Sequence, residues 1–228
     1  MNEATDGQLL KDWRERREPA AFSALVQRHQ DALLRQARGL LGAGSTYEDV
    51  VQEVFLKLAR EGLELPSEAS GDPGAERRQL LGWLHTVTRN ACMDAIRSET
   101  RRKRREHDAA SPDRAEGGLH RVEAEDTRSV VERELQKLPV DQRDVLVLRL
   151  LADRSYREIA EITGKKIGTV GWLISEGLKH LSAQLAPLLA MDGAPASGLA
   201  AATRPALGQN TGRNFGSGGS DRTQGGLA

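Results

Sequence analysis

The stretch "SYREIAEITGKKIGTVGWLISEGLKHL", residues 155–181, decides which fold this chain can adopt. It predicts a short helix with Ser155 as its N-cap, a turn at Gly164, and a second helix that starts at Thr169. The small Ala160 permits the close helix–helix approach that this turn requires. The pattern favours a DNA-binding helix-turn-helix, and an ordinary helical hairpin within a core is the alternative.

The rest of the chain predicts further helices. Apolar residues recur at helical spacing in residues 6–18, 18–42, 45–61, 76–98 and 140–153. We expect Asp6 to cap the first of these helices, Pro19 to begin the second and Gly42 to end it. No segment alternates polar and apolar residues for long enough to form a sheet, so the predicted class is all-α.

Gly-rich and Pro-rich segments divide the chain. Residues 62–75 read as a loop, and residues 106–122 lack periodicity, which is typical of a flexible linker. The end of the chain is rich in Gly, Ala, Ser and Thr and is expected to be disordered. We therefore predict two small helical domains joined by a flexible linker: a domain at 1–105, the linker at 106–134, a second domain at 135–190 and a tail at 191–228.

Composition excludes several classes of protein. Apolar residues make up 38% of the 228 residues and charged residues 29%, and no run reaches the ~20 apolar residues that span a bilayer. The N-terminus lacks the basic and apolar regions of a secretory signal, so we expect a cytoplasmic protein without membrane insertion. The lone Cys92 cannot form an intramolecular disulfide.

The formal net charge of zero conceals a strong partition. Residues 99–105 carry a net charge of +4, whereas residues 106–134 carry −5. Because physiological salt screens charges over ~8 Å, each block can address a different partner.

No arrangement of residues points to catalysis. The five histidines are scattered, and neither a metal-ligand spacing nor a Gly-rich phosphate loop is present in the sequence. We therefore predict neither an active site nor a cofactor. Asp49, Gln52 and Glu53 share one helical face, which leaves three interpretations open: a divalent cation site, a protein-binding surface or a solvated face.

Four motifs in order carry a resemblance to a known family. They are "AFSALVQRHQDALLRQARGLLG", "YEDVVQEVFLKLAR", "GWLHTVTRNACMDAIRSETRR" and "LQKLPVDQRDVLVLRLLADRSYREIAEITGKKIGTV". Together they span residues 20–105 and 135–185 and resemble the extracytoplasmic-function sigma factors, group IV of the sigma-70 family of bacterial RNA polymerase. That group keeps only the regions called 2 and 4.

The resemblance implies a transcription initiation factor that is not an enzyme. Its expected partners are core RNA polymerase and promoter DNA, and in the family an anti-sigma protein often masks both regions. Region 2 would open the minus-ten element and region 4 would contact the minus-thirty-five element. The resemblance assigns the polymerase contact to Asp49, Gln52 and Glu53.

The same resemblance implies a DNA-facing helix in region 2. Trp83 on this helix is either a core residue or a base-stacking residue, and Asp94 either pairs with Arg97 within the helix or orients it toward DNA. The basic run at 101–105 would grip phosphates, and a solvated helix end is its alternative. The implied DNA-binding side chains of region 2 are Arg89, Asn90, Arg97, Arg101 and Arg102.

Region 4 departs from the family, whose second helix usually carries several cations. Gly171, Leu173 and Glu176 stand in their place here. Lys165 also stands where an apolar residue normally plugs the turn, and we expect Ile167 to substitute for it. The upstream element is therefore expected to be bound weakly or to have an unusual composition. The remaining candidates for DNA contact are Lys165, Lys166, Thr169, Trp172 and Ser175, with Lys179 at the periphery.

Two other classes compete with this interpretation. A conventional helix-turn-helix repressor or activator would lack the polymerase-facing helix and would bind duplex DNA specifically without polymerase. A recombinase or small nuclease would need a nucleophile or metal cluster that the sequence does not supply.

Overall fold

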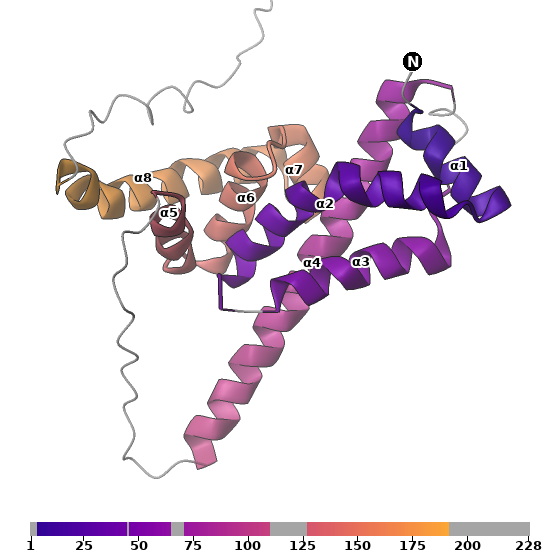
Figure 1. Ribbon diagram of the computed structural model, residues 1–228. Coiled ribbons are helices and arrows are strands. Elements are labelled where there is room, and N and C mark those ends of the chain that lie inside the picture. Colours follow the sequence, from indigo (N-terminus) through magenta and orange to yellow (C-terminus); the bar gives the residue numbers. More distant parts are fainter. Residues whose placement is uncertain (1–3, 45, 65–70, 110–126, 192–228) are drawn as a thin grey trace, which may run out of the picture. The chain divides into compact units, whose positions relative to one another are not determined.

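The computed structural model describes residues 4–44, 46–64, 71–109 and 127–191, and within these ranges it contains eight α-helices and no strand (Figure 1). The predicted all-α class is therefore confirmed. None of the described helices is long and apolar enough to cross a bilayer. The helices are α1 (Asp6–Arg16), α2 (Pro19–Leu41), α3 (Tyr47–Glu61), α4 (Pro73–Ala109), α5 (Thr127–Gln136), α6 (Val140–Leu150), α7 (Tyr156–Thr163) and α8 (Ile167–Met191).

Helix α1 begins one residue earlier than its predicted cap. Thr5 is the N-cap, and it forms a capping box with Gln8, whereas Asp6 lies inside the helix and is buried. Asp6 accepts hydrogen bonds from Arg28 and His29 of α2, the latter at 3.1 Å. Burial alone would raise the pKa of Asp6, but these bonds outweigh burial and hold that pKa below its ordinary value. Asp6 therefore ties α1 to α2 rather than capping α1.

Helix α2 has the predicted bounds and forms the centre of the first four helices. It begins at Pro19, ends before Gly42, and contacts α1, α3 and α4. Gln36 of α2 donates through Nε2 to the carbonyl of His85 (3.1 Å), and His85 donates through Nδ1 to Gln36 Oε1 (2.6 Å). Burial, followed by the nearby Arg154 charge, lowers the pKa of His85 to about 3, so this imidazole is neutral at ordinary pH.

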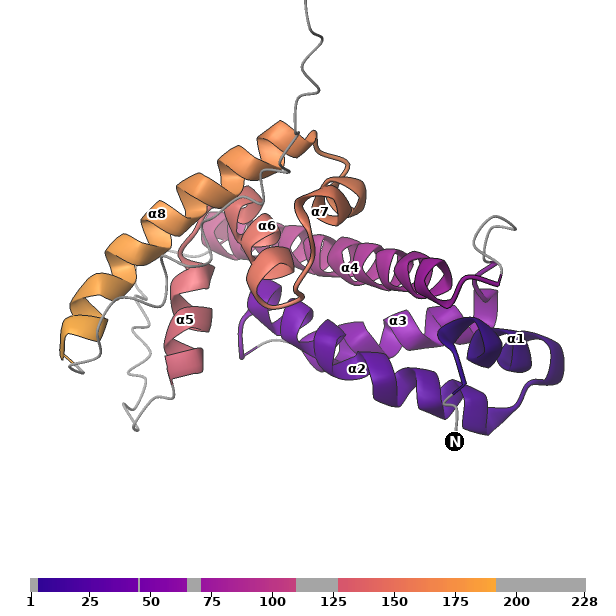
Figure 2. The same ribbon diagram turned by 90° about the horizontal axis from the view of Figure 1, so that it is seen from above.

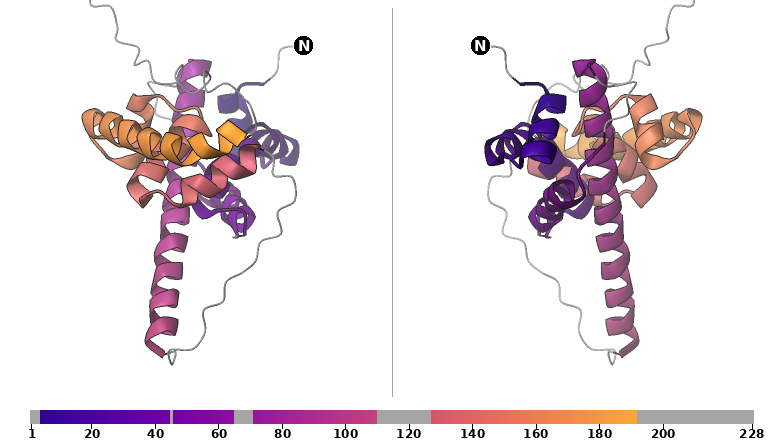
Figure 3. Two further views of the ribbon diagram at one scale, coloured as in Figure 1. Left: turned by 90° about the vertical axis from the view of Figure 1, so that its left-hand side faces the viewer. Right: turned by 90° about the vertical axis from the view of Figure 1, so that its right-hand side faces the viewer.

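Helix α4 is longer at both ends than the sequence suggested. Asp72 caps its start by accepting a hydrogen bond from the Gly74 backbone amide (2.9 Å), and Pro73 occupies the first helical position. The helix continues to Ala109, past the point at 106 where the linker was expected. Figures 1 and 3 show that its C-terminal end runs beyond the other helices. The predicted linker residues 110–126 and the tail from 192 lie outside the described residues.

Helices α6, α7 and α8 pack on one another, and α6 supplies the buried apolar run 145–148 (Figure 2). Ser155 is the N-cap of α7 and forms a capping box with Glu158, as the sequence predicts. Gly164 ends α7 with a φ of 68°, a left-handed conformation that favours glycine. Helix α8 begins at Ile167, two residues before the predicted start at Thr169.

Helices α2 and α4 also contact α5, α6 and α7, and all eight helices belong to one compact unit. The division into domains at 1–105 and 135–190 stays a prediction.

Candidate protein and nucleic-acid interfaces

The three residues that the sequence assigned to polymerase lie together on α3. Asp49, Gln52 and Glu53 are all exposed, and their spacing of three and four residues places them on one face. Glu53 forms an exposed ion pair with Arg60 of the same helix (3.6 Å). Within the described part of the chain, no group of three or more His, Cys, Asp or Glu residues could hold a metal ion. The face therefore offers acidic and amide groups to another macromolecule.

An apolar groove adjoins this acidic face. It lies between α2 and α3 and has a volume of about 460 Å³. Leu56, one turn along from Gln52 and Glu53, is 47% exposed at the edge of the groove, although it is a large hydrophobic residue. An exposed leucine beside exposed acids is typical of a protein-binding surface, because it offers both apolar area and charge. The groove is lined by Phe22, Val26, Gln30, Leu34, Glu48, Val51, Gln52, Phe55 and Leu56.

The predicted DNA-binding residues of α4 do not share one environment. Asn90 and Arg97 are exposed, and Arg97 donates to Asp94 Oδ1 at 2.7 Å, so the intrahelical partner expected for Asp94 is present. Arg89 instead donates through Nε to Asp144 Oδ2 of α6 at 2.7 Å. Its side chain is 17% exposed and that of Asp144 is 1% exposed. Arg89 is therefore engaged within the protein.

Arg101 and Arg102 lie on the projecting end of α4, where both are exposed. Arg102 donates to both carboxylate oxygens of Glu99 at 2.9 Å and forms a further ion pair with Glu106 (3.4 Å). Of these two arginines, only Arg101 has no ion pair within the described part of the chain. This end of α4 can approach a phosphate backbone without competition from other helices.

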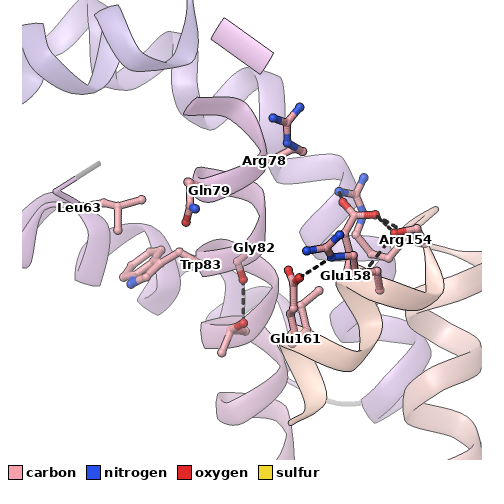
Figure 4. A pocket seen from close by; sticks show the side chains of 12 residues that line it. Leu63, Arg78, Gln79, Gly82, Trp83, Arg154, Glu158 and Glu161 are labelled. Carbon is pink, nitrogen blue, oxygen red and sulfur yellow. Dashed lines mark hydrogen bonds and ion pairs between the residues drawn. The ribbon is translucent and has the colours of Figure 1, made fainter. Parts of the chain in front are cut away.

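Trp83 is half-buried and packs against the core, and it also lines a cleft of about 810 Å³ between α4 and α7. Both interpretations of Trp83 therefore keep a basis in the structure. Figure 4 shows Trp83 near Leu63 on one side of α4, while Glu158 and Glu161 of α7 lie on the other side. The cleft is close to electrically neutral, because its α7 arginines, Arg154 and Arg157, pair with those two glutamates at 3.0 and 3.3 Å.

The outward face of α8 carries most of the region 4 candidates. Lys166, Thr169, Trp172, Ser175 and Lys179 are all exposed, and Trp172 is 61% exposed. Because the first helical hydrogen bond runs from the Val170 amide to the Lys166 carbonyl, the amides at 167–169 have no helical acceptor. Such free amides at a helix start are suited to a phosphate oxygen.

Most cations near this face already have partners. Lys165 donates to Asp141 Oδ1 of α6 (3.0 Å) and is half-buried, and Lys179 donates to Glu176 (2.6 Å). Lys166 is the only lysine at 165–179 that has no ion pair within the described part of the chain. The expectation that Ile167 plugs the turn is wrong, since Ile167 is 54% exposed. Lys165 stays beside the turn, where the ion pair with Asp141 neutralises its charge.

Asp144 is the interface residue that the sequence analysis missed. It lies in the fully buried run 142–148 of α6, where a carboxylate requires a partner. An acid within an otherwise apolar helix segment was the available signal, but its partner is 55 residues away in sequence.

Comparisons with known proteins agree with these features. Residues 25–64 match the family described as Sigma-70 region 2, and residues 128–181 match the family described as Sigma-70, region 4. The chain is 32% identical over 180 residues to the ECF RNA polymerase sigma factor EcfG of Rhodopseudomonas palustris, covering 76% of this chain and 88% of that protein. It is 31% identical to the ECF RNA polymerase sigma factor SigE of Mycolicibacterium smegmatis over 73% of this chain, but spans 62% of the length of SigE.

Two solved structures have a similar fold. One is the sigma factor RpoE of Bartonella quintana in complex with the anti-sigma factor NepR, with a TM-score of 0.53, 23% identity and coverage of 72% of this chain and 96% of that one. The other is CnrH in complex with the cytosolic domain of CnrY, also with a TM-score of 0.53 and 23% identity, over 80% of this chain and 95% of that one.

Proposed function

The chain belongs to the extracytoplasmic-function sigma factors of the sigma-70 family, and from this premise we propose that it binds core RNA polymerase and directs promoter-specific transcription initiation. It acts by binding, since sigma factors are not enzymes. Where the polymerase works, in the cytoplasm, this chain would work as well.

The observation that carries the proposal is the exposed face of α3. Asp49, Gln52 and Glu53 stand beside Leu56 and the groove between α2 and α3, and the described residues leave this surface uncovered. We assign it to the polymerase. A repressor that acts alone has no need for such a second surface remote from its DNA-reading helix.

The two DNA contacts are assigned to α4 and α8. In region 2, Asn90, Arg97 and Arg101 are exposed and able to meet the minus-ten element, and Arg89 joins them once it leaves Asp144. The basic end of α4 supplies contacts to phosphates that do not depend on sequence. A melted strand is held by stacking and positive charge, and Trp83 offers the stacking surface beside these cations.

Region 4 would contact the upstream element through the start of α8. The amides at 167–169 and Lys166 favour a phosphate contact, and Trp172 offers an apolar surface of the kind that packs against a thymine methyl. With Lys165 and Lys179 paired to acids, the contact has less positive charge than a cationic recognition helix would supply. Weak binding, or binding to an unusual sequence, follows for the upstream element.

An anti-sigma protein is a further proposed partner. RpoE and CnrH, whose folds are similar, were each solved with such a protein. The groove between α2 and α3 and the exposed Trp172 are the apolar surfaces available to it.

The proposal is tested by transcription in vitro with core polymerase from the source organism and a library of promoter fragments. The expected result is transcripts from a restricted set of fragments, and only when the chain is added. The triple variant of Lys166, Thr169 and Trp172 to Ala should lose selection of the upstream element but retain binding to polymerase. Specific binding of the free chain to duplex DNA, without stimulation of polymerase, would favour a repressor instead.

A further inference from the structure

Arg89 of α4 makes two demands on one guanidinium. The proposed function requires it at the promoter, yet its Nε lies 2.7 Å from Asp144 Oδ2 and its side chain is largely buried. Gly82, Thr86 and Arg89 follow one another at four and three residues, so they share one face of α4. Gly82 and Thr86 line the cleft whose other wall is α7, and Arg89 meets α6 (Figure 4). This face of α4 is therefore covered by region 4.

The contact continues at the C-terminal end of α2. Gln136 donates to the Gly39 carbonyl (2.8 Å), and Arg143 donates to the Leu40 carbonyl (3.1 Å) and to Gln136 Oε1. Carbonyls in the last turn of a helix lack helical partners and carry partial negative charge, so an amide and a guanidinium are suitable donors there. Region 4 thus caps α2.

Gly39 shows how closely the helices approach. A Cβ at Gly39 would lie 2.6 Å from Leu151 Cδ1 and 3.0 Å from Val147 Cγ2, both on the region 4 side. These distances are too short for a real Cβ, so the contact in this form requires glycine. Since α2 would be a better helix with alanine here, the substitution is disruptive only between the two regions.

The polar bonds of this contact are incompletely satisfied, which allows it to open. Asp144 Oδ1 is buried and accepts no hydrogen bond from the described residues. Burial also raises the pKa of Asp144, although the Arg89 charge opposes this. A buried ion pair with an unsatisfied oxygen contributes little net stability, because desolvation offsets most of the attraction. Such a pair specifies the closed arrangement without locking it.

We propose that the packing of α6 and α7 against α4, centred on the Arg89–Asp144 ion pair, is an autoinhibitory contact that withholds Arg89 and its face of α4 from DNA until polymerase separates the two regions. The inference rests on the proposed function for the role of Arg89. By itself, the free chain would bind promoter DNA weakly. Binding to polymerase would shift the chain to the open form, with affinity reduced beforehand by the fraction that is open.

The first test measures the distance between the regions and requires neither DNA nor polymerase. Spin labels are attached at Ser98→Cys on α4 and Ser182→Cys on α8, both exposed positions. Native Cys92 is fully buried with a thiol pKa raised to about 12, so it does not compete for label. The wild-type background should give one narrow distance distribution. Both Asp144→Asn and Gly39→Ala should add a longer, broader component.

The matched control is Asp31→Asn, which removes an exposed carboxylate of α2 and should leave the distribution unchanged. A broad distribution in the wild-type background, or an unchanged one in Asp144→Asn, overturns the proposal. If Asp144→Asn does not fold, Gly39→Ala decides by the same criterion. Because no polymerase is present, this failure is distinct from a failure of the proposed function.

The second test measures binding of the full chain to a fluorescent mixed-sequence DNA duplex at low salt. Asp144→Asn should bind about tenfold more tightly than wild type, as expected if about a tenth of wild-type molecules are open. Adding Arg89→Ala should abolish this gain. Equal affinity of wild type and Asp144→Asn would show that the contact does not restrain DNA binding.

Discussion

Replacing His85 by Asn should remove a large part of the loss of stability at mildly acidic pH. The folded chain holds His85 neutral down to a pKa of about 3, whereas the unfolded chain binds a proton at an ordinary value of 6.5. The unfolded state therefore takes up the proton first as pH falls, and stability is lost below about pH 6.5. With ~1.4 kcal/mol for each unit of pKa, the loss is about 2 kcal/mol at pH ~5 and about 5 kcal/mol at pH ~3.

The assay is urea unfolding followed by tryptophan fluorescence, at about pH 7.5 and about pH 5. Asn at 85 keeps a donor for Gln36 Oε1 but does not titrate, so the difference between wild type and variant isolates the imidazole. His180→Asn, at an exposed position of α8, is the matched control and should retain the wild-type pH dependence. If wild type and His85→Asn lost the same free energy of unfolding between the two pH values, the buried neutral imidazole would be refuted.

Three further substitutions separate stability from function. Leu33→Ala deletes a fully buried side chain of α2 and should cost ~2–5 kcal/mol in urea unfolding, and a cost under ~1 kcal/mol would contradict the packing. Ser155→Ala removes the capping box of α7 and should cost about 1 kcal/mol in the same assay, unless a Gly at 155 proves equally costly, which would argue against a cap. Trp172→Ala should change the unfolding free energy by less than ~0.5 kcal/mol, because Trp172 is 61% exposed, yet weaken the upstream footprint by ~1 kcal/mol; an unchanged footprint excludes the base contact.

Local signals in the sequence predicted the elements whose ends depend on neighbouring residues. Pro19 and Gly42 mark the bounds of α2, and Ser155 with Glu158 marks the start of α7, because caps act within one turn. The start of α4 was missed for the same reason. In "GDPG" the glycines and proline read as a loop, yet Asp72 is a capping side chain and Pro73 fits the first helical position.

The contacts between the two regions were beyond the sequence. The Arg89–Asp144 ion pair joins residues 55 apart, and the pattern of α6 shows only that Asp144 is buried, not what neutralises it. The position of Ile167 depends on how Lys165 packs beside the turn, which hydrophobic spacing does not encode. The exposed α3 face, in contrast, followed from the spacing of Asp49, Gln52 and Glu53 alone, while its role stays a prediction.

The most direct test is retention of the full chain on immobilised core RNA polymerase. The account predicts that wild type is retained and that the double variant Asp49→Lys with Glu53→Lys loses at least about tenfold in affinity, since both exposed charges are reversed on the proposed contact surface. Glu15→Lys, an exposed charge reversal on α1, is the matched control and should be retained like wild type. Failure of core polymerase to retain the wild-type chain, or equal retention of the double variant, would contradict the account.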